Sequence, residues 1–201
     1  MIFSNRLVSR GLLVAAGFVL STGIALAQAA PPAATPAAPG RPAAPDVKMV
    51  GDWAVRCFPI NSPSPCDIYQ ELADKDTRQR VLAISIAYVP SLDRNGIIIS
   101  VPLEVSIPKG LVIQTDNFTS PALKYRRCDR NGCYVEMPMD AASISSLSKS
   151  GPDAHIKITA DGGKEFSLKF SLNGFASAYD QMVQQAKEKA KPLPKQDGAA
   201  Q

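Results

Sequence analysis

Hydrophobic and polar residues alternate with a period of two along much of this chain. The segments HIKITA (155–160) and KEFSLKFSL (164–172) alternate polar and apolar side chains, whereas RVLAISIAYV (80–89) and GIIISVPLEVSI (96–107) are rich in β-branched residues. Both patterns are typical of half-buried β-strands. Because short segments with turn chemistry separate the runs, we predict a mainly-β domain built as an antiparallel sandwich or barrel.

Turn-forming residues lie between these runs. DRNG occurs twice, at 93–96 and 129–132, and DGG at 161–163 stands between two alternating runs. Asn-Gly and Asp-Gly pairs favour the positive backbone angles of tight hairpin turns. We therefore expect turns at these places, with the clearest hairpin at DGG.

A short helix is predicted before residue 151. The segment MDAASISSLSKSG offers Asp140 as N-cap, apolar Ile144 and Leu147 three residues apart, and Gly151 as terminator. A helix this short would close one end of the stacked sheets.

A C-terminal helix is predicted in FASAYDQMVQQAKEKAK. Three lysines lie near its end, where the helix dipole favours cations. The apolar residues share one face, which we interpret as core contacts rather than a ligand site. That face consists of Phe175, Tyr179, Met182, Val183 and Ala186.

The N-terminus has the order of regions found in a secretory signal peptide. Arg6 and Arg10 precede and flank an apolar run at 11–20, and Ala25-Leu26-Ala27 follows as an A-x-A cleavage site. The apolar run is short of the roughly 20 residues that a membrane-spanning helix needs. We therefore predict that residues 1–27 are a signal peptide and that no transmembrane segment remains after its removal.

The rest of the chain divides by composition into three parts. Residues 28–47 consist mainly of Ala and Pro with almost no large apolar side chain, so we expect a disordered tether there. Residues 48–190 are long enough for one domain with one core, the predicted β-sandwich. The polar, Pro-containing end at 191–201 is expected to be a disordered tail.

Charge and cysteine content narrow the class of protein. Loss of Arg6 and Arg10 with the signal peptide lowers the formal net charge from +4 to +2, which gives no reason to expect a nucleic-acid partner. An even number of cysteines in an exported chain favours two disulfides. All four lie after the signal peptide: Cys57, Cys66, Cys128 and Cys133.

Geometry favours pairing of cysteines that are neighbours in sequence, although three pairings are possible. A four-residue hairpin loop would place Cys128 directly opposite Cys133 at disulfide distance, with Gly132 in a turn conformation. A two-residue Asn-Gly turn would instead misalign the two cysteines. Cys57 and Cys66 bracket a Pro-rich loop that fits a connection between two strands.

Alternative roles for the cysteines are less well supported. The Cys57–Cys66 spacing is too open for a usual four-cysteine zinc site, and export disfavours thiolates. Neither pair has the Cys-x-x-Cys spacing of a thiol oxidoreductase. A redox role stays open because three arginines could lower the thiol pKa of Cys128. They are Arg126, Arg127 and Arg130.

Other candidate catalytic or ligand-binding residues favour structural interpretations. His155 is the single histidine and shares the polar face of its strand, so a solvated position fits better than a general base. For Trp53, burial in the core fits better than ligand stacking. We find no hydrolase, zincin or phosphate-binding motif, and we expect no enzyme activity, cofactor or metal.

Several motifs occur in an order that resembles the invasion-associated locus B family. Gly51-Asp52-Trp53 shortly precedes Cys57, IPKGLVI occupies 107–113, Gly132 directly precedes Cys133, and Asn173-Gly174-Phe175 opens the last predicted helix. The resemblance covers about residues 47–186. It implies an exported bacterial envelope protein with an immunoglobulin-like β-sandwich, in the periplasm or secreted and associated with the cell surface.

The resemblance transfers no catalytic residue and leaves two classes of function. The first is a non-enzymatic binding module whose partner is an envelope or host protein, with host-cell interaction and virulence as the role implied by the family name. The second is a periplasmic thiol-exchange enzyme, motivated by Cys128 and Cys133. An envelope assembly chaperone that adds a strand to a client lies between the two.

Overall fold

The computed structural model describes residues 43–191. The predicted signal peptide, the tether as far as residue 42 and the tail from residue 192 lie outside the described residues. Strand β1 begins at Asp46, so the folded part starts two residues inside the segment expected to be tether.

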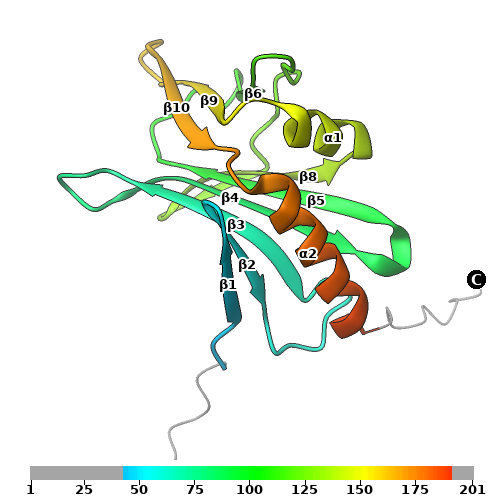
Figure 1. The fold of residues 1–201 in the computed structure, drawn as a ribbon. Helices are drawn as coiled ribbons and strands as arrows, with labels where there is room; N and C mark the ends of the chain where they lie inside the picture. The colour runs from blue at the N-terminus through cyan, green and yellow to red at the C-terminus, as the bar shows by residue number, and fades with distance from the viewer. Residues whose placement is uncertain (1–42, 192–201) are drawn as a thin grey trace, which may run out of the picture. The chain divides into compact units, whose positions relative to one another are not determined.

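Within residues 43–191, ten strands form two antiparallel sheets, which confirms the mainly-β sandwich (Figure 1). Strands β1 to β5 pair in chain order, and β8 and β7 extend the same sheet. In that order, the seven-stranded sheet contains β1 (Asp46–Val50), β2 (Trp53–Cys57), β3 (Cys66–Ala73), β4 (Arg80–Val89), β5 (Arg94–Val101), β8 (Gly132–Met139) and β7 (Arg127–Asp129). The smaller sheet has the order β10 (Glu165–Ser171), β9 (Asp153–Thr159), β6 (Leu111–Gln114).

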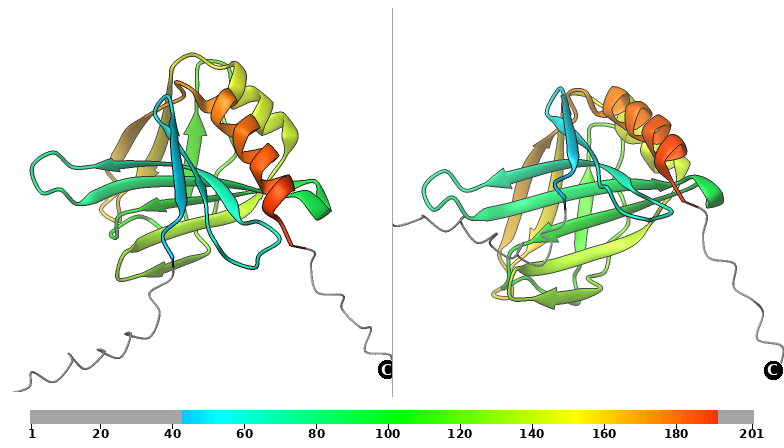
Figure 2. Two further views of the ribbon diagram at one scale, coloured as in Figure 1. Left: turned by 60° about the horizontal axis from the view of Figure 1, so that its bottom comes forward. Right: turned by 90° about the horizontal axis from the view of Figure 1, so that it is seen from below.

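One hydrophobic core lies between the sheets and under the long helix α2 (Phe175–Lys189). Alternate residues of the strands enter it, as in β2, where the first, third and fifth side chains are buried. Trp53 of β2 touches the rings of Phe170 in β10 and Phe175 in α2, so α2 and the smaller sheet lie on the same face of the larger one (Figure 2). We call this the inner face of the seven-stranded sheet and the opposite one its outer face.

The predicted hairpin at DGG is confirmed, whereas the turn expected at the first DRNG lies earlier in the chain. DGG connects β9 to β10 as a hairpin, and Gly163 has φ 85°. At the first DRNG, the chain reverses earlier than expected, because a 3-10 turn at Pro90–Leu92 and the left-handed Asp93 (φ 46°) complete the reversal. Residues 94–96 already belong to β5.

Both predicted helices are confirmed. In α1 (Ala141–Lys149) the Asp140 carboxylate accepts a 2.6 Å hydrogen bond from the Ser143 backbone N–H, the expected N-cap. The helix ends at Ser150, whose extended backbone acts as C-cap one residue before the predicted terminator Gly151. In α2 the predicted apolar face is buried or half-buried, and Ala178 extends it.

The Asp140 cap predicts a pH-dependent contribution to stability. Hydrogen bonds from Ser143 lower the pKa of Asp140 below its usual value. A carboxylate with a depressed folded pKa stabilises the fold above its unfolded pKa, and this contribution is lost as the pH falls through the folded pKa. We expect Asp140→Ala to lower the melting temperature at pH 7, with a gap from wild type that closes in acid. Asp140→Asn, which still caps, should show a gap that depends less on pH; a gap for Asp140→Ala that is the same at every pH would contradict the assignment.

Candidate functional site

Two glycines of the family-like motifs, Gly51 and Gly174, meet in space. Gly51 lies in the β1–β2 hairpin loop with φ 59°, and Gly174 precedes α2 with φ 80°. A β-carbon on Gly51 would collide with the Asn173 carbonyl group, and one on Gly174 with the Val50 carbonyl oxygen and the Gly51 backbone. Both positions therefore require glycine, for the backbone angle and for the close approach. We call this contact the glycine crossing.

Hydrogen bonds surround the glycine crossing. The Asp52 N–H donates to the Asn173 carbonyl oxygen at 3.1 Å, and the Ser171 hydroxyl donates to the Asp52 carboxylate at 2.6 Å. The buried Gln70 amide donates to the Asp52 and Ser171 carbonyl oxygens at 3.0 and 3.2 Å and accepts from the Ser171 N–H at 2.9 Å. The Asp52 carboxylate is thus part of the bonding that holds the β1–β2 turn to the end of β10.

Trp53 packs beneath the glycine crossing, on the side of the hydrophobic core. Its side chain is 0% exposed and forms edge-to-face contacts with Phe175 and Phe170, with ring centroids 5.2 and 6.5 Å apart. The indole N–H donates to the Ser171 carbonyl oxygen at 3.0 Å. The prediction that Trp53 is a core residue is correct. The residues that carry the family resemblance here hold the β1–β2 turn, the end of β10 and the start of α2 together.

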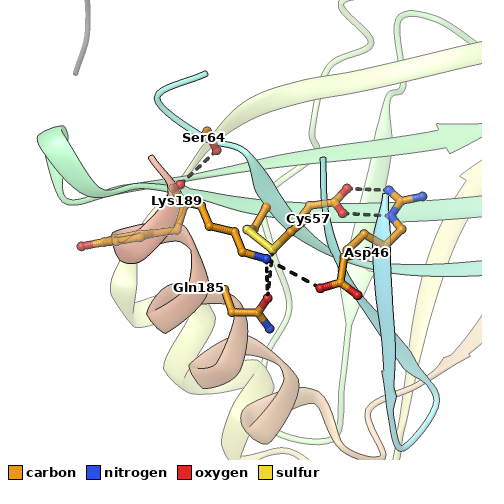
Figure 3. The surroundings of a disulfide bond; sticks show 9 residues. Asp46, Cys57, Ser64, Gln185 and Lys189 are labelled. Atoms are coloured by element: carbon orange, nitrogen blue, oxygen red, sulfur yellow. Dashed lines mark hydrogen bonds and ion pairs between the residues drawn. A yellow bond between two sulfur atoms is a disulfide. The ribbon is translucent and has the colours of Figure 1, made fainter. Parts of the chain in front are cut away.

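The Cys57–Cys66 disulfide lies under the C-terminal half of α2 (Figure 3). The two cysteines are directly opposed in β2 and β3, with Cα atoms 4.1 Å apart, and both are buried. The Gln185 side-chain oxygen lies 3.2 Å from Cys57 Sγ, a contact rather than a hydrogen bond because a disulfide sulfur carries no proton. Lys189 Nζ lies 3.3 Å from Gln185 Oε1 and 3.7 Å from an Asp46 carboxylate oxygen. The disulfide thus links β2 to β3, and Lys189 connects α2 to the edge strand β1.

The Cys128–Cys133 disulfide closes the β7–β8 hairpin, the pairing expected from the sequence. The cysteines are opposed with Cα atoms 4.0 Å apart. The loop itself is shorter than expected, because Asp129 also pairs with Gly132 and only residues 130–131 form the loop. Gly132 (φ 140°) allows this extension, since a β-carbon there would collide with the Val101 carbonyl oxygen.

Two of the three arginines near this disulfide, Arg126 and Arg127, are engaged with carboxylates. Arg127 forms ion pairs with Glu136 at 2.9 Å and with Asp129 at 2.7 Å, and its guanidinium lies 3.9 Å from the centre of the Tyr134 ring. Arg126 lies 3.5 Å from Glu136. A hydrogen bond from Asn131 and the charge of Arg127 hold the pKa of Asp129 below its usual value. Positive charge that is neutralised in this way gives little activation of a neighbouring thiol.

The two disulfides should differ in their accessibility to reductants. Cys128 is exposed, whereas Cys57 and Cys66 are 3% and 1% exposed. We expect alkylation of the unreduced protein to label no cysteine, and mild reduction to release Cys128 and Cys133 first. Mass spectrometry of tryptic peptides measures both. Labelling without reductant, or earlier release of the buried pair, would contradict this assignment.

The single histidine lies on β9 next to a serine of β10. His155 is half-buried on β9, with Nδ1 3.1 Å from the Ser167 hydroxyl. In this part of the chain, no three His, Cys, Asp or Glu side chains gather closely enough to hold a metal ion. The helices found there are also too short or too polar to cross a membrane.

Two apolar hollows flank Met137 and Pro138 of β8, which line both. We call these two residues the β8 ridge. The hollow on its inner side has a volume of about 330 Å³ and lies between β5, β6, β8 and α1. Its apolar lining includes Ile97, Ile113, Phe118, Leu123, Met139 and Ala142.

The hollow on the outer side of the ridge is larger, about 470 Å³, and lies over β4, β5 and β8. Leu92 and Ile98, which line it, are 51% and 44% exposed, and Met137 is 39% exposed. Arg94 and Arg126 stand at its border. Exposed apolar residues bordered by arginine are typical of protein-binding surfaces.

The sequence analysis did not identify the β8 ridge. Met137 shares the inner parity of Val135 and Met139, which predicts burial, but it borders the hollow between β5, β6, β8 and α1 and is 39% exposed. The available signal was Pro138, because proline within a strand indicates an edge position. Indeed, β7 pairs only with residues 132–134 of β8, so it does not cover the edge of β8 at the β8 ridge.

Comparisons with known proteins agree with this fold. The family model described as "Invasion associated locus B (IalB) protein" matches residues 53–183. The crystal structure of invasion associated protein B from Bartonella henselae superposes with a TM-score of 0.61 at 21% sequence identity, covering 70% of this chain and 98% of that chain. A search of curated protein sequences returns no significant match.

Proposed function

The chain belongs to the invasion associated locus B family, and we propose that it is a non-enzymatic envelope protein that acts by binding another envelope or host protein. The predicted signal peptide directs it out of the cytoplasm, and two disulfides suit an oxidising compartment. In this proposal the sandwich is a rigid support for a contact surface, and no bond is made or broken in the partner.

The observation that carries the proposal is the β8 ridge with its two hollows. Ridge and hollows together present three large, partly exposed apolar side chains, Leu92, Ile98 and Met137, at one place. A partner that places one apolar side chain on each side of the ridge would bury them, and such anchors supply most of the affinity of an interface. Arg94 at the border favours a carboxylate on the partner.

Thiol exchange receives less support from the same structure. Activation of Cys128 would need free positive charge beside it, but Arg126 and Arg127 are paired with carboxylates. No cysteine is free within residues 43–191 to act as the attacking thiol. The binding hypothesis needs neither feature.

Site-specific photo-cross-linking in intact cells tests the proposed function. A photo-reactive phenylalanine analogue replaces Ile98 or Met137 in the exported chain, and Ser177, exposed on α2, is the matched control position. We expect one defined covalent adduct from the two β8-ridge positions and none from Ser177. Equal labelling from all three positions, or no adduct from any, would reject the proposal.

A further inference from the structure

Strand β1 is an edge strand whose side chains are almost entirely outside the core. It ends the seven-stranded sheet next to β2, and within residues 43–191 no strand pairs with its other side (Figure 1). Four of its five residues are exposed and the fifth is half-exposed. Val47 and Met49 are 51% and 62% exposed on the outer face. An unpaired edge that carries apolar side chains is a template for strand addition.

The hairpin register identifies which backbone groups of β1 are unpaired. Val50 and Trp53 close a two-residue loop, so they form a hydrogen-bonded pair. Hydrogen-bonded pairs alternate along an antiparallel ladder, which turns the backbone groups of Asp46, Lys48 and Val50 toward β2. The N–H and C=O groups of Val47 and Met49 consequently point away from the sheet.

A second copy of β1 matches this edge in one antiparallel register. With a twofold axis at Lys48, Val47 of each copy pairs with Met49 of the other, and all four outward groups of each strand find partners. Moving the axis to Val47 would pair Met49 with Pro45, which has no N–H. Moving it to Met49 would pair Val47 with Gly51, which lies in the hairpin loop at φ 59°.

Side chains are complementary in the same register. On the outer face, Val47 lies opposite Met49 of the second copy, which gives two apolar cross-strand pairs. On the inner face, Asp46 is diagonal to Lys48 of the second copy, within reach of the long lysine side chain, and this occurs twice. The two Lys48 side chains oppose each other at the axis, and the two Asp46 carboxylates offset that repulsion.

We infer that two copies of this chain associate through β1, which joins their seven-stranded sheets into one continuous sheet. The observations that carry this inference are the unpaired edge and its self-complementary pattern, so it does not depend on the proposed partner site at β8. A five-residue edge is smaller than a standard interface, so the association is reversible and depends on concentration. The β8 ridge lies toward the other end of the sheet and remains free in the dimer.

Sedimentation velocity of the disulfide-bonded, exported chain over a range of concentrations tests this inference. We expect a dimer fraction that rises with concentration and falls to background in Met49→Asp. Met49 is 62% exposed, so this variant should keep the wild-type melting temperature. Ile98→Asp, an equivalent change on the outer face of β5, should dimerise as wild type does and lose the cross-link at the β8 ridge. A wild-type chain that stays monomeric, or Met49→Asp that still dimerises, would overturn the inference.

A cysteine placed at the axis tests the register. Opposed residues of a non-hydrogen-bonded pair have Cα atoms about 4.5 Å apart, within disulfide range. Lys48→Cys should therefore form a covalent dimer on mild oxidation, with the 48–48 bridge found by peptide mapping. Asp46→Cys is the control, since Val50 of the second copy opposes it. Trapping of both variants to the same extent, or of neither, would rule out this register.

Discussion

Replacing Gly174 by alanine lowers the free energy of unfolding by about 2 to 5 kcal/mol, the sum of a left-handed backbone penalty and an overpacking penalty. The residue has φ 80°, and its added methyl group would meet the Val50 carbonyl oxygen and the Gly51 backbone. These atoms belong to the end of β1 and the hairpin loop, which the Asp52–Asn173 hydrogen bond holds against the start of α2. Urea unfolding, followed by the fluorescence of Trp53, measures the loss.

Substitutions at two other glycines separate the backbone penalty from the overpacking penalty in this loss of stability. Gly163 has φ 85° with nothing within 4 Å of an added β-carbon, so Gly163→Ala should cost only the backbone penalty, about 1 to 2 kcal/mol. Gly162 has neither a positive φ nor a neighbour, and Gly162→Ala should change stability by less than about 0.5 kcal/mol. If Gly174→Ala costs no more than Gly163→Ala, the glycine crossing does not constrain the fold.

Truncation of the Trp53 side chain should also lower the free energy of unfolding strongly. Trp53→Ala should destabilise the protein by about 3 to 5 kcal/mol, because it removes a fully buried ring and leaves a cavity between β2, β10 and α2. Trp53→Phe keeps an aromatic ring and loses the hydrogen bond to Ser171, whose carbonyl oxygen still accepts from Gln70. Its cost should be about 0.5 to 1.5 kcal/mol for the hydrogen bond, with a further loss for the smaller ring.

Chemical denaturation followed by far-ultraviolet circular dichroism compares these variants, since the fluorophore is lost. Ile98→Ala, a truncation of a 44% exposed side chain, is the control and should be near neutral. Trp53→Phe should keep the photo-cross-link at the β8 ridge, because Trp53 acts in folding. A near-neutral Trp53→Ala, or loss of the cross-link in folded Trp53→Phe, would show that Trp53 contacts a ligand or partner.

Local chemical signals were sufficient to predict several features from the sequence. DGG specified the β9–β10 hairpin because Gly163 supplies a positive φ within the loop itself. Asp140 specified the start of α1 through a hydrogen bond to a residue three positions ahead. Cys128 and Cys133 were assigned to opposed strand positions because only a short loop separates them. Each of these structures is determined within a few residues.

Features that depend on distant partners could not be predicted in the same way. Asp46 and Val47 lie at the end of an Ala- and Pro-rich segment whose composition favours a tether. They nevertheless form a strand, because they pair with Cys57 and Arg56 of β2. The glycine crossing joins Gly51 to Gly174 through a contact that no local pattern encodes. The exposure of Met137 depends on the hollow beside it, which is lined by segments far apart in the sequence.

We propose that the sandwich binds its partner through the β8 ridge. Cross-linking from the photo-reactive analogue at position 98, in a chain that also carries Met137→Arg, tests this proposal most directly. Met137 is 39% exposed, so the variant should remain folded with its melting temperature nearly unchanged. We predict that the adduct formed in cells from position 98 is lost in this background, because an arginine on the ridge blocks the apolar anchors. An adduct of undiminished yield from folded Met137→Arg would contradict the account.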